Sequence, residues 1–165
     1  MILVAAQFKV PQNRTRLFIV GNRLGKTFDS PQTTKDKLSC QGAFLDHPLS
    51  NLENHLNRDH SSESVIRYMK LNFGERDQLG RVDRLDPRLP SKTVIAGGTA
   101  GGGRSHLHPY IPRTLTVREC AILQTFPDDY IFEGPVARQF TQVGNAVPPI
   151  LGAQLASAMF NSFFN

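Results

Sequence analysis

The chain has 165 residues, which is enough for one domain with a hydrophobic core or for two small lobes. Lys and Arg together number 19 and Asp and Glu 14, and the resulting charge of +5 is compatible with a polyanionic partner such as nucleic acid. Two cysteines are too few for a disulfide framework or a cysteine-rich zinc site, and no apolar run approaches the length of a membrane span, so we expect a protein of the reducing cytoplasm.

The first third of the chain contains one predicted strand and a long irregular region. Residues 17–21, Leu-Phe-Ile-Val-Gly, are a short apolar run closed by glycine, and this pattern predicts a buried strand. The segment before it contains Pro11, which resists regular structure. Residues 24–60 are polar and irregular, which predicts mainly loop.

A helix is predicted to follow this loop. Ser61 or Ser62 can cap it, and it should run to about Leu71. Its spacing of apolar residues predicts one apolar face, made of Val65, Ile66 and Met69.

The middle of the chain predicts a strand that enters a glycine-rich loop. Residues 74–92 are charged and interrupted by two prolines, and Thr93-Val94-Ile95 then predicts a short strand. Glycine stands at positions 97, 98, 101, 102 and 103, so the backbone there can approach a ligand closely. No Gly-Lys-Ser/Thr follows these glycines, which argues against a nucleotide-binding P-loop.

Two helices are predicted in the last third. Thr116 and Glu119 form a capping box, and the helix that they begin should run to about Phe126 and stop before Pro127. A final helix should start at Pro148-Pro149, because proline suits a first helical turn. This helix is apolar on several faces and should be buried on more than one side; its apolar residues include Leu151, Leu155, Ala158, Met159 and Phe163.

Three segments resemble, in this order, the C-terminal motifs of the DNA cytosine-5 methyltransferases. The first is Pro11-Gln12-Asn13-Arg14-Thr15-Arg16 with the apolar run after it, the second covers residues 113–130, and the third is Gln142-Val143-Gly144-Asn145-Ala146-Val147-Pro148-Pro149. The intervening Asn54-His55 and residues 84–98 resemble the variable target-recognition region of the family. The resemblance therefore spans nearly the whole chain.

The resemblance implies an α/β fold, namely the C-terminal part of a Rossmann-like methyltransferase dependent on S-adenosylmethionine, with a small mixed recognition lobe. It divides the chain into residues 1–24, the end of the catalytic lobe; residues 25–112, the target-recognition region; and residues 113–165, a helix and a cofactor-closing helix that return to the catalytic lobe.

The motifs of the family's N-terminal half are missing from their expected places. These are a glycine-rich cofactor loop, a Pro-Cys-Gln nucleophile loop and a Glu-Asn-Val segment. Ser39-Cys40-Gln41-Gly42 imitates the nucleophile loop, but it lacks the proline and follows the arginine motif, so we interpret Cys40 as a loop cysteine without a catalytic role. Cys120 should be packed inside its helix.

We therefore expect a subunit of a split enzyme, or a fragment of a longer one, that is inactive without an N-terminal half carrying the catalytic cysteine. Joined to that half, it would bind double-stranded DNA and support methyl transfer from S-adenosylmethionine to C5 of a flipped-out cytosine. The resemblance also suggests a restriction-modification system and a prokaryotic, nucleoid-associated location. The alternative is a non-enzymatic DNA-binding module left from such an enzyme.

The resemblance assigns site residues in the first and third motifs. Gln12, Arg14 and Arg16 would lie at the edge of the base pocket, where an arginine fork can hold a base oxygen, a carboxylate or a phosphate. The alternative for the arginines is a surface pair after a turn. Gly144, Asn145 and Val147 would contact S-adenosylmethionine, in a turn that also leads into the last helix.

Residues 76–108 are the candidate DNA-reading region. Phosphate contacts there would give an affinity that falls with salt, and one or two arginines could read guanine edges. The alternative is a solvated, flexible loop. His106 and His108 have no third ligand at a usual spacing, so we interpret them as structural or close to DNA and expect no metal site. The predicted DNA contacts are Arg84, Arg88, Lys92, Thr93, Gly97, Gly98 and Arg104.

Two expectations concern packing. Arg118 and Glu119 should hold the helix cap and the junction between the lobes. The last helix and residues 17–21 should lack packing partners in the isolated chain and leave apolar surface exposed.

Overall fold

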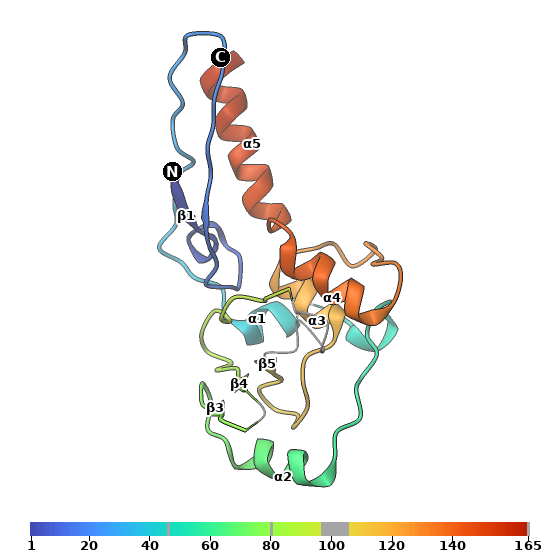
Figure 1. The fold of residues 1–165 in the computed structure, drawn as a ribbon. Coiled ribbons are helices and arrows are strands. Elements are labelled where there is room, and N and C mark those ends of the chain that lie inside the picture. Colours follow the sequence, from blue (N-terminus) through green and yellow to red (C-terminus); the bar gives the residue numbers. More distant parts are fainter. Residues whose placement is uncertain (46, 80, 97–105, 165) are drawn as a thin grey trace.

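The computed structural model describes residues 1–45, 47–79, 81–96 and 106–164, and these residues form a body of short elements with an elongated arm (Figure 1). Both chain ends lie on the arm, and its long helix α5 (Pro149–Phe164) projects away from the body. Helices and strands are both present, as expected of an α/β protein. Among the described residues, no helix combines the length and apolar character needed to cross a membrane.

The arm consists of a two-stranded sheet, a 3₁₀ helix and α5. Strand β1 (Ile2–Val4) pairs antiparallel with β2 (Thr15–Leu17), and the 3₁₀ helix η1 (Ala5–Phe8) follows β1. The apolar residues between η1 and α5 form a small core made of Leu3, Ala5, Phe8, Val10 and Leu151.

The predicted buried strand over residues 17–21 is wrong. The strand ends at Leu17, which is 66% exposed, and Ile19 is 90% exposed. The register explains why: Leu17 lies opposite Ile2, and the backbones of Phe18 and Met1 form the last pair of hydrogen bonds. Among the described residues no opposite strand continues the ladder beyond Phe18, and Leu17 and Ile19 are exposed, in agreement with the expected loss of packing partners.

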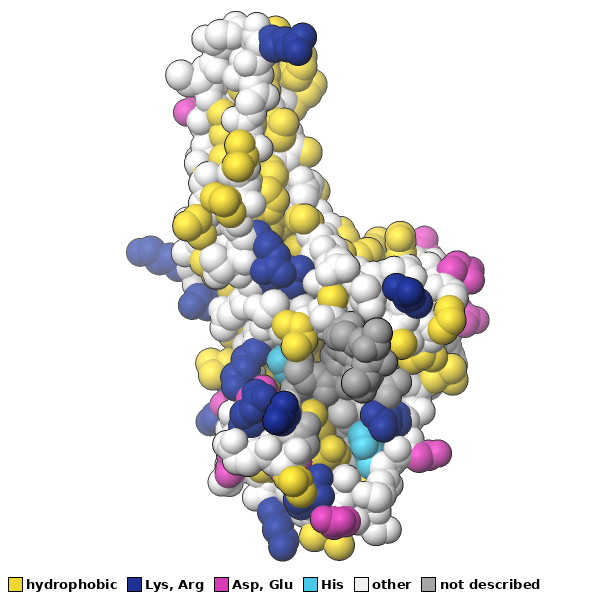
Figure 2. Space-filling model, viewed as in Figure 1, with side chains coloured by type: hydrophobic (Ala, Val, Ile, Leu, Met, Phe, Trp, Pro, Cys, Tyr) yellow, Lys and Arg dark blue, Asp and Glu magenta, His cyan; other side chains and the backbone are white. Residues whose placement is uncertain are grey.

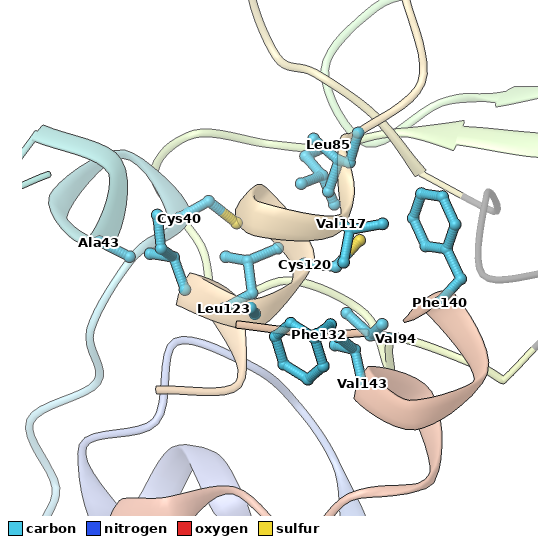
Figure 3. Close-up of a cluster of buried hydrophobic side chains, with 13 residues drawn as sticks. Cys40, Ala43, Leu85, Val94, Val117, Cys120, Leu123, Phe132, Phe140 and Val143 are labelled. Atoms are coloured by element: carbon cyan, nitrogen blue, oxygen red, sulfur yellow. The ribbon is translucent and has the colours of Figure 1, made fainter. Parts of the chain in front are cut away.

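The core of the body is built around helix α3 (Val117–Leu123), every residue of which is buried. Helix α1 (Cys40–Leu45) and helix α4 (Val136–Asn145) pack against it. Figure 3 shows their side chains converging: Cys40 and Ala43 come from α1, Val117, Cys120 and Leu123 from α3, and Phe140 and Val143 from α4.

Residues 24–60 are mainly loop, as predicted, and helix α1 is one of two short helical elements within them. The Ser39 hydroxyl accepts a hydrogen bond from the Gly42 amide at 3.1 Å, and the buried side chains of α1 pack against α3. A second short element, the 3₁₀ helix η2 (Leu49–Asn51), also falls in this region. Tertiary packing stabilises helix α1, because six residues without a strong apolar period are too few to form a stable helix alone.

Helix α2 (Ser62–Lys70) covers a small sheet at the far end of the body. Strand β4 (Val82–Arg84) pairs antiparallel with β3 (Arg76–Asp77) and parallel with β5 (His106–Leu107). Ser61 caps α2 as predicted, since its hydroxyl accepts from the Ser64 amide.

The predicted apolar face of α2 is wrong in two of its three residues. Ile66 is 53% exposed and Met69 65%, whereas Tyr68 is buried against Val82 and Leu107. The sheet under this helix is narrow, and only the helix face that carries Tyr68 packs against its apolar side chains.

The predicted strand over residues 93–95 is also absent. Residues 91–94 run beside residues 11–14 with a single bridge between Gln12 and Ser91, and side chains replace the remaining ladder bonds. The predicted glycine-rich loop and Arg104 lie outside the described residues.

The capping box and the start of the last helix are confirmed. Thr116 and Glu119 exchange both capping bonds, and α5 begins at Pro149. Helix α3 ends at Leu123 rather than near Phe126, because Thr125 turns the backbone to a φ of 64°. Helix α4 is an element that the prediction lacked.

Candidate functional site

Segments from all three motifs meet where the arm joins the body. We call this place the junction; it consists of residues 11–16, 91–96, 123–124 and 143–147. Its first two segments are joined by backbone bonds, from Ser91 N to Pro11 O at 2.9 Å and from Asn13 N to Ser91 O at 2.7 Å. The Thr93 hydroxyl adds a bond to Asn13 O at 2.9 Å.

Gln12 is fully buried and connects two of these segments. Its Oε1 accepts from the Val94 amide at 3.0 Å, and its Nε2 donates to Leu123 O at 3.3 Å. Both ends of the side-chain amide are therefore used inside the protein. Gln12 was expected at the edge of a substrate pocket, and the structure gives it a positioning role.

Arg14 is only 1% exposed, and its guanidinium joins the segment around Val94 to the end of α4. It donates to Val94 O at 3.0 Å, to Gly144 O at 2.7 Å and to Ala146 O at 3.0 Å. The last carbonyls of a helix have no helical partner and carry the negative end of the helix dipole, so they stabilise a buried cation. The alternative of a surface arginine pair is wrong for Arg14.

The charge on Arg14 persists despite its burial. Burial and the neighbouring positive charge of Arg16 lower the pKa of Arg14 to about 10, which keeps it protonated at neutral pH. Its Nε is buried without a hydrogen-bond partner among the residues that the structure describes. The free energy of a buried cation that is stabilised only by carbonyl dipoles depends closely on the position of each of those carbonyls.

Arg16 differs from its two neighbours in the motif. It is half-buried, and its Nη1 donates to the carbonyl of the adjacent Thr15 at 2.7 Å in an exposed hydrogen bond. A local bond of this kind exchanges readily for a bond to a ligand. Arg16 is thus the arginine of the motif that can reach a molecule outside the chain.

Gly144 is packed directly on backbone. A Cβ atom at this position would lie 2.2 Å from Ala96 N and 2.5 Å from Ala96 Cα, distances that no side chain tolerates. Gly144 is expected from the motif to contact the cofactor, and the structure turns it toward residues 95–96 instead. Asn145 and Val147 each follow a residue whose carbonyl Arg14 holds, and both are exposed. Of the three predicted cofactor residues, these two can therefore contact a ligand.

The predicted DNA contacts that the structure describes divide into partly buried side chains with partners inside the protein and exposed side chains. Arg84 donates to Pro109 O at 2.9 and 2.7 Å and to Leu71 O at 2.6 Å, and its guanidinium lies 5.1 Å from the Phe73 ring centroid. These contacts give Arg84 a structural role. The Thr93 hydroxyl donates its hydrogen bond to Asn13 O. Gly97, Gly98 and Arg104 lie outside the described residues.

Arg88 and Lys92 keep their charges at the surface. The Arg88 side chain is 75% exposed and paired with Asp86, and the Lys92 side chain is 60% exposed with its Nζ 2.6 Å from Asp83. Asp83 also pairs with Arg76 at 2.9 Å. Figure 2 shows Lys and Arg side chains gathered on one side of the visible face of the body, with most acidic side chains toward its other edge. Such a surface suits a polyanion.

The two histidines and the polar pair of α3, Arg118 and Glu119, form hydrogen bonds within the protein. His106 and His108 are buried; Nδ1 of His108 accepts from the amides of Tyr110 and Ile111, both at 3.1 Å. No group of three metal-ligating side chains occurs within the described residues. Glu119 holds the helix cap as expected and pairs with Arg113. Arg118, which was expected with Glu119 at the cap and the junction between the lobes, donates to the backbone carbonyls of three loop residues, Glu53, Pro127 and Tyr130.

The two cysteines cannot act as nucleophiles in this structure. Cys40 is the first residue of α1 rather than a loop residue, and its thiol donates to Leu89 O at 3.0 Å. Burial raises its pKa to about 12, and burial also raises the pKa of Cys120. A reactive thiol needs the opposite environment, one that stabilises the thiolate.

One buried junction residue, Gln124, had not been predicted. Its Nε2 donates to Val143 O at 2.6 Å, so it ties the end of α3 to α4. Helix α4 itself could have been found, because Pro135 precedes it and Val136, Phe140 and Val143 follow the spacing of one helical face.

A family model described as C-5 cytosine-specific DNA methylase matches residues 1–161. The chain is 33% identical to the type II methyltransferase M1.HphI of Haemophilus parahaemolyticus over 96% of this chain and 46% of that protein. It is 47% identical to the type II methyltransferase M.AquIB of Picosynechococcus sp. over 46% of this chain and 60% of that protein, so that protein is the shorter of the two.

A crystal structure with a similar fold aligns with 100% of this chain. It is of a protein described as a DNA modification methyltransferase encoded within a prophage (E. coli), with a TM-score of 0.71 at 24% identity over 60% of that protein. The chain spans about half the length of those curated relatives that it matches from end to end.

Proposed function

This chain belongs to the family of C-5 cytosine-specific DNA methylases, and we propose that it is the part of such an enzyme that binds double-stranded DNA and completes the site of methyl transfer to C5 of cytosine. The observation that carries this proposal is the junction. Gln12 and Arg14 hold the first motif, the start of the recognition region and the end of α4 together, and they leave Arg16, Asn145 and Val147 accessible.

Each accessible residue suits one task in the reaction. A cytosine must leave the duplex before its C5 can be reached. Arg16 can hold the carbonyl oxygen of the flipped base or a flanking phosphate with the fixed geometry of its guanidinium. Lys92, Arg88 and Arg76 can bind phosphates with the exposed parts of their side chains, which gives an affinity that falls with salt.

S-adenosylmethionine would supply the methyl group when bound, and two residues of this chain fit it. The exposed amide of Asn145 can hydrogen-bond its polar groups, and the exposed side chain of Val147 can contact its apolar parts. Arg14 orients both residues by holding the carbonyl of Gly144, which precedes Asn145, and the carbonyl of Ala146, which precedes Val147.

We also propose that a second chain or segment carries the nucleophile and most of a Rossmann-like cofactor lobe. The 165 residues contain no Pro-Cys-Gln, and the two cysteines that they do contain are buried. The arm exposes the apolar residues that such a lobe would cover, among them Leu17, Ile19, Phe160 and Phe164. In this arrangement residues 1–24 and 113–165 belong to the catalytic lobe, and residues 25–112 form the recognition region of a type II modification enzyme.

Labelled methyl transfer from S-adenosylmethionine to DNA tests the proposal. The chain is mixed with an N-terminal half that carries Pro-Cys-Gln and Glu-Asn-Val, and Arg16→Ala is compared with Arg23→Ala, a change at an exposed arginine away from the junction. We expect transfer only in the mixture, with a loss of about 10- to 100-fold for Arg16→Ala, because a charged hydrogen bond contributes about 1.5–3 kcal/mol.

Two results would contradict the proposal. One is transfer by this chain alone, and the other is an Arg16→Ala variant as active as Arg23→Ala. Salt-sensitive DNA binding with no transfer in the mixture would favour a non-enzymatic DNA-binding module instead.

A further inference from the structure

The loop that carries Arg88 is anchored to the body on both sides of that residue. Pro87 O accepts from the Gln41 amide at 3.1 Å, and Leu89 O accepts from the Cys40 amide at 2.9 Å. Both amides belong to the first turn of α1, where helical amides have no acceptor within the helix. The Pro87 side chain is buried as well. The backbone on either side of Arg88 is therefore fixed, although Arg88 itself is exposed.

The Arg88 side chain is fixed by Asp86. Oδ1 of Asp86 accepts from Nε of Arg88 at 2.9 Å and from its amide at 3.0 Å, and Oδ2 accepts from Nη2 at 2.7 Å. The side-chain hydrogen bond from Arg88 is the main cause that lowers the pKa of Asp86 to about 2, so its carboxylate is charged at neutral pH. A two-point contact between arginine and carboxylate is the geometry in which an exposed ion pair keeps its arrangement.

The pair has a protected side and an open side. The Asp86 side chain is 13% exposed and the Arg88 side chain 75%, so the carboxylate supports the guanidinium from the side of the protein. A guanidinium has five N–H donors in one plane, and Asp86 takes two of them, so three remain on Nη1 and Nη2. Two of these form the end of the fork, where parallel N–H groups can meet two neighbouring acceptors.

A guanine base offers the matching pair of acceptors. Its O6 and N7 lie side by side in the major groove, and a two-point contact from arginine to these atoms is the commonest base-specific contact in protein–DNA complexes. Adenine has a donor in place of O6, so the same fork would meet one acceptor and one donor. A phosphate needs only positive charge, whereas the fixed plane of the Arg88 guanidinium suits a base edge.

The Arg88 loop lies beside the segments that the proposed function gives to DNA. One pocket is lined jointly by the first motif and this loop, with Asn13, Asp86 and Lys92 among its residues. Lys92 follows Arg88 by four positions, and its exposed ammonium group is a point charge without a fork. Lys92 therefore suits a phosphate, and Arg88 suits a base on the same stretch of DNA.

We propose that Arg88 determines part of the target sequence by binding O6 and N7 of a guanine, and that Asp86 is the positioning residue that presents its guanidinium. The inference rests on the proposed function, which places DNA against the recognition region. Because Asp86 already holds the Arg88 side chain, less side-chain entropy is lost on binding than for a free arginine. The guanine lies in the recognition sequence beside the methylated cytosine.

The test records which cytosines are methylated by the assembled enzyme, this chain plus its N-terminal half. Limiting enzyme acts on a pool of random-sequence duplexes, and bisulfite sequencing then gives the bases around every methylated cytosine, so the target need not be known beforehand. Arg88→Ala and Asp86→Asn are compared with Lys92→Ala, which removes a phosphate-binding charge, and with Arg23→Ala, an exposed arginine away from the junction.

For the wild type we expect a G·C pair at one fixed position beside the methylated cytosine. Arg88→Ala should lower the preference for that pair by about 10-fold or more and leave the other positions unchanged, as expected for the loss of one two-point base contact. Asp86→Asn should relax the same pair to a smaller degree, because an amide cannot accept from both Nε and Nη2. Lys92→Ala should slow methylation at all sites with an unchanged sequence preference, and Arg23→Ala should change neither.

Three results would overturn the inference. An Arg88→Ala variant that is slower with the wild-type sequence preference would show that Arg88 binds a phosphate. Relaxation at an A·T pair would show that it does not bind guanine, and a wild-type preference in Asp86→Asn would remove the role of Asp86. Absence of methylation by the wild-type assembly would instead contradict the proposed function.

Discussion

At the residue scale, the roles of the fully buried polar side chains were the hardest to predict from the sequence. Motif resemblance pointed to Gln12 and Arg14, but as pocket residues, because a sequence motif does not say which way a side chain faces. Only the fold shows that carbonyls separated from Arg14 by up to 132 positions complete its hydrogen bonds. Glu119 was assigned correctly, since its partner Thr116 is three residues away and the capping geometry is local.

The buried thiols lead to the first prediction. With its pKa near 12, Cys40 is ionised in only about one molecule in ten thousand at pH 8, and Cys120 is fully buried as well. We expect neither thiol to react with a disulfide reagent in the native chain within minutes, and both to react at once in denaturant. Absorbance of the released thiolate measures this directly. Rapid native reaction that disappears in Cys40→Ala would show that Cys40 is accessible and reactive.

Three histidines give the stability of the chain a predictable dependence on pH. Burial lowers the pKa of His55, His106 and His108 below the ordinary value of 6.5. The unfolded chain therefore takes up protons before the folded chain does, so stability is fully present above pH 6.5 and is lost as pH falls below it. We expect a lower urea midpoint at pH 5.5 than at pH 7.5.

His108 should account for part of this loss, because protonation of Nδ1 removes the acceptor of the Tyr110 and Ile111 amides. The His108→Gln variant should show a smaller difference in urea midpoint between the two pH values. An equal or larger difference in that variant would mean that His108 does not titrate in this range.

At the scale of elements, local sequence signals predicted the starts of three helices correctly, whereas the pairing of strands distant in sequence could not be predicted. The capping box located the start of α3, the serine cap located α2 and the proline pair located α5. The strand predicted over residues 17–21 failed because a ladder needs an opposite strand, and the strand over residues 93–95 failed because Gln12 takes the place of a ladder. Helix α1 depends on packing against α3, which no short window of sequence reveals.

The capping box of α3 should be a large local contributor to stability. The Thr116 hydroxyl accepts from the Glu119 amide at 3.1 Å in a buried hydrogen bond, and it bonds His55 at 2.9 Å in a part-buried one. We expect Thr116→Ala to lower the free energy of unfolding by about 2 kcal/mol, the loss of a cap together with an unsatisfied buried amide. Chemical denaturation measures it.

The matched comparison is Ser61→Ala, which removes the exposed cap of α2 and should cost about 0.5–1 kcal/mol. Thr116→Ser should keep most of the stability because it keeps the hydroxyl. Equal losses of unfolding free energy in the two alanine variants would show that burial does not increase the contribution of the α3 cap.

At the scale of the whole molecule, the family could be identified from three motifs in order, whereas the way in which they meet could not. The junction brings together segments from both ends of the chain, and its geometry follows from packing across 80 to 132 positions. The apolar surface of the arm was expected from the absence of the N-terminal motifs. The structure agrees, since Leu17 and Ile19 are exposed beside a strand ladder that ends at Phe18.

Identification of the methylated base tests the proposed function most directly. This chain, an N-terminal half carrying Pro-Cys-Gln, and both together are expressed in a host without cytosine methylation, and the DNA is digested to nucleosides for mass spectrometry. We expect 5-methyldeoxycytidine only when both are present, and its loss with Arg16→Ala but not with Arg23→Ala. Methylated cytosine from this chain alone, or none from the pair, would contradict it.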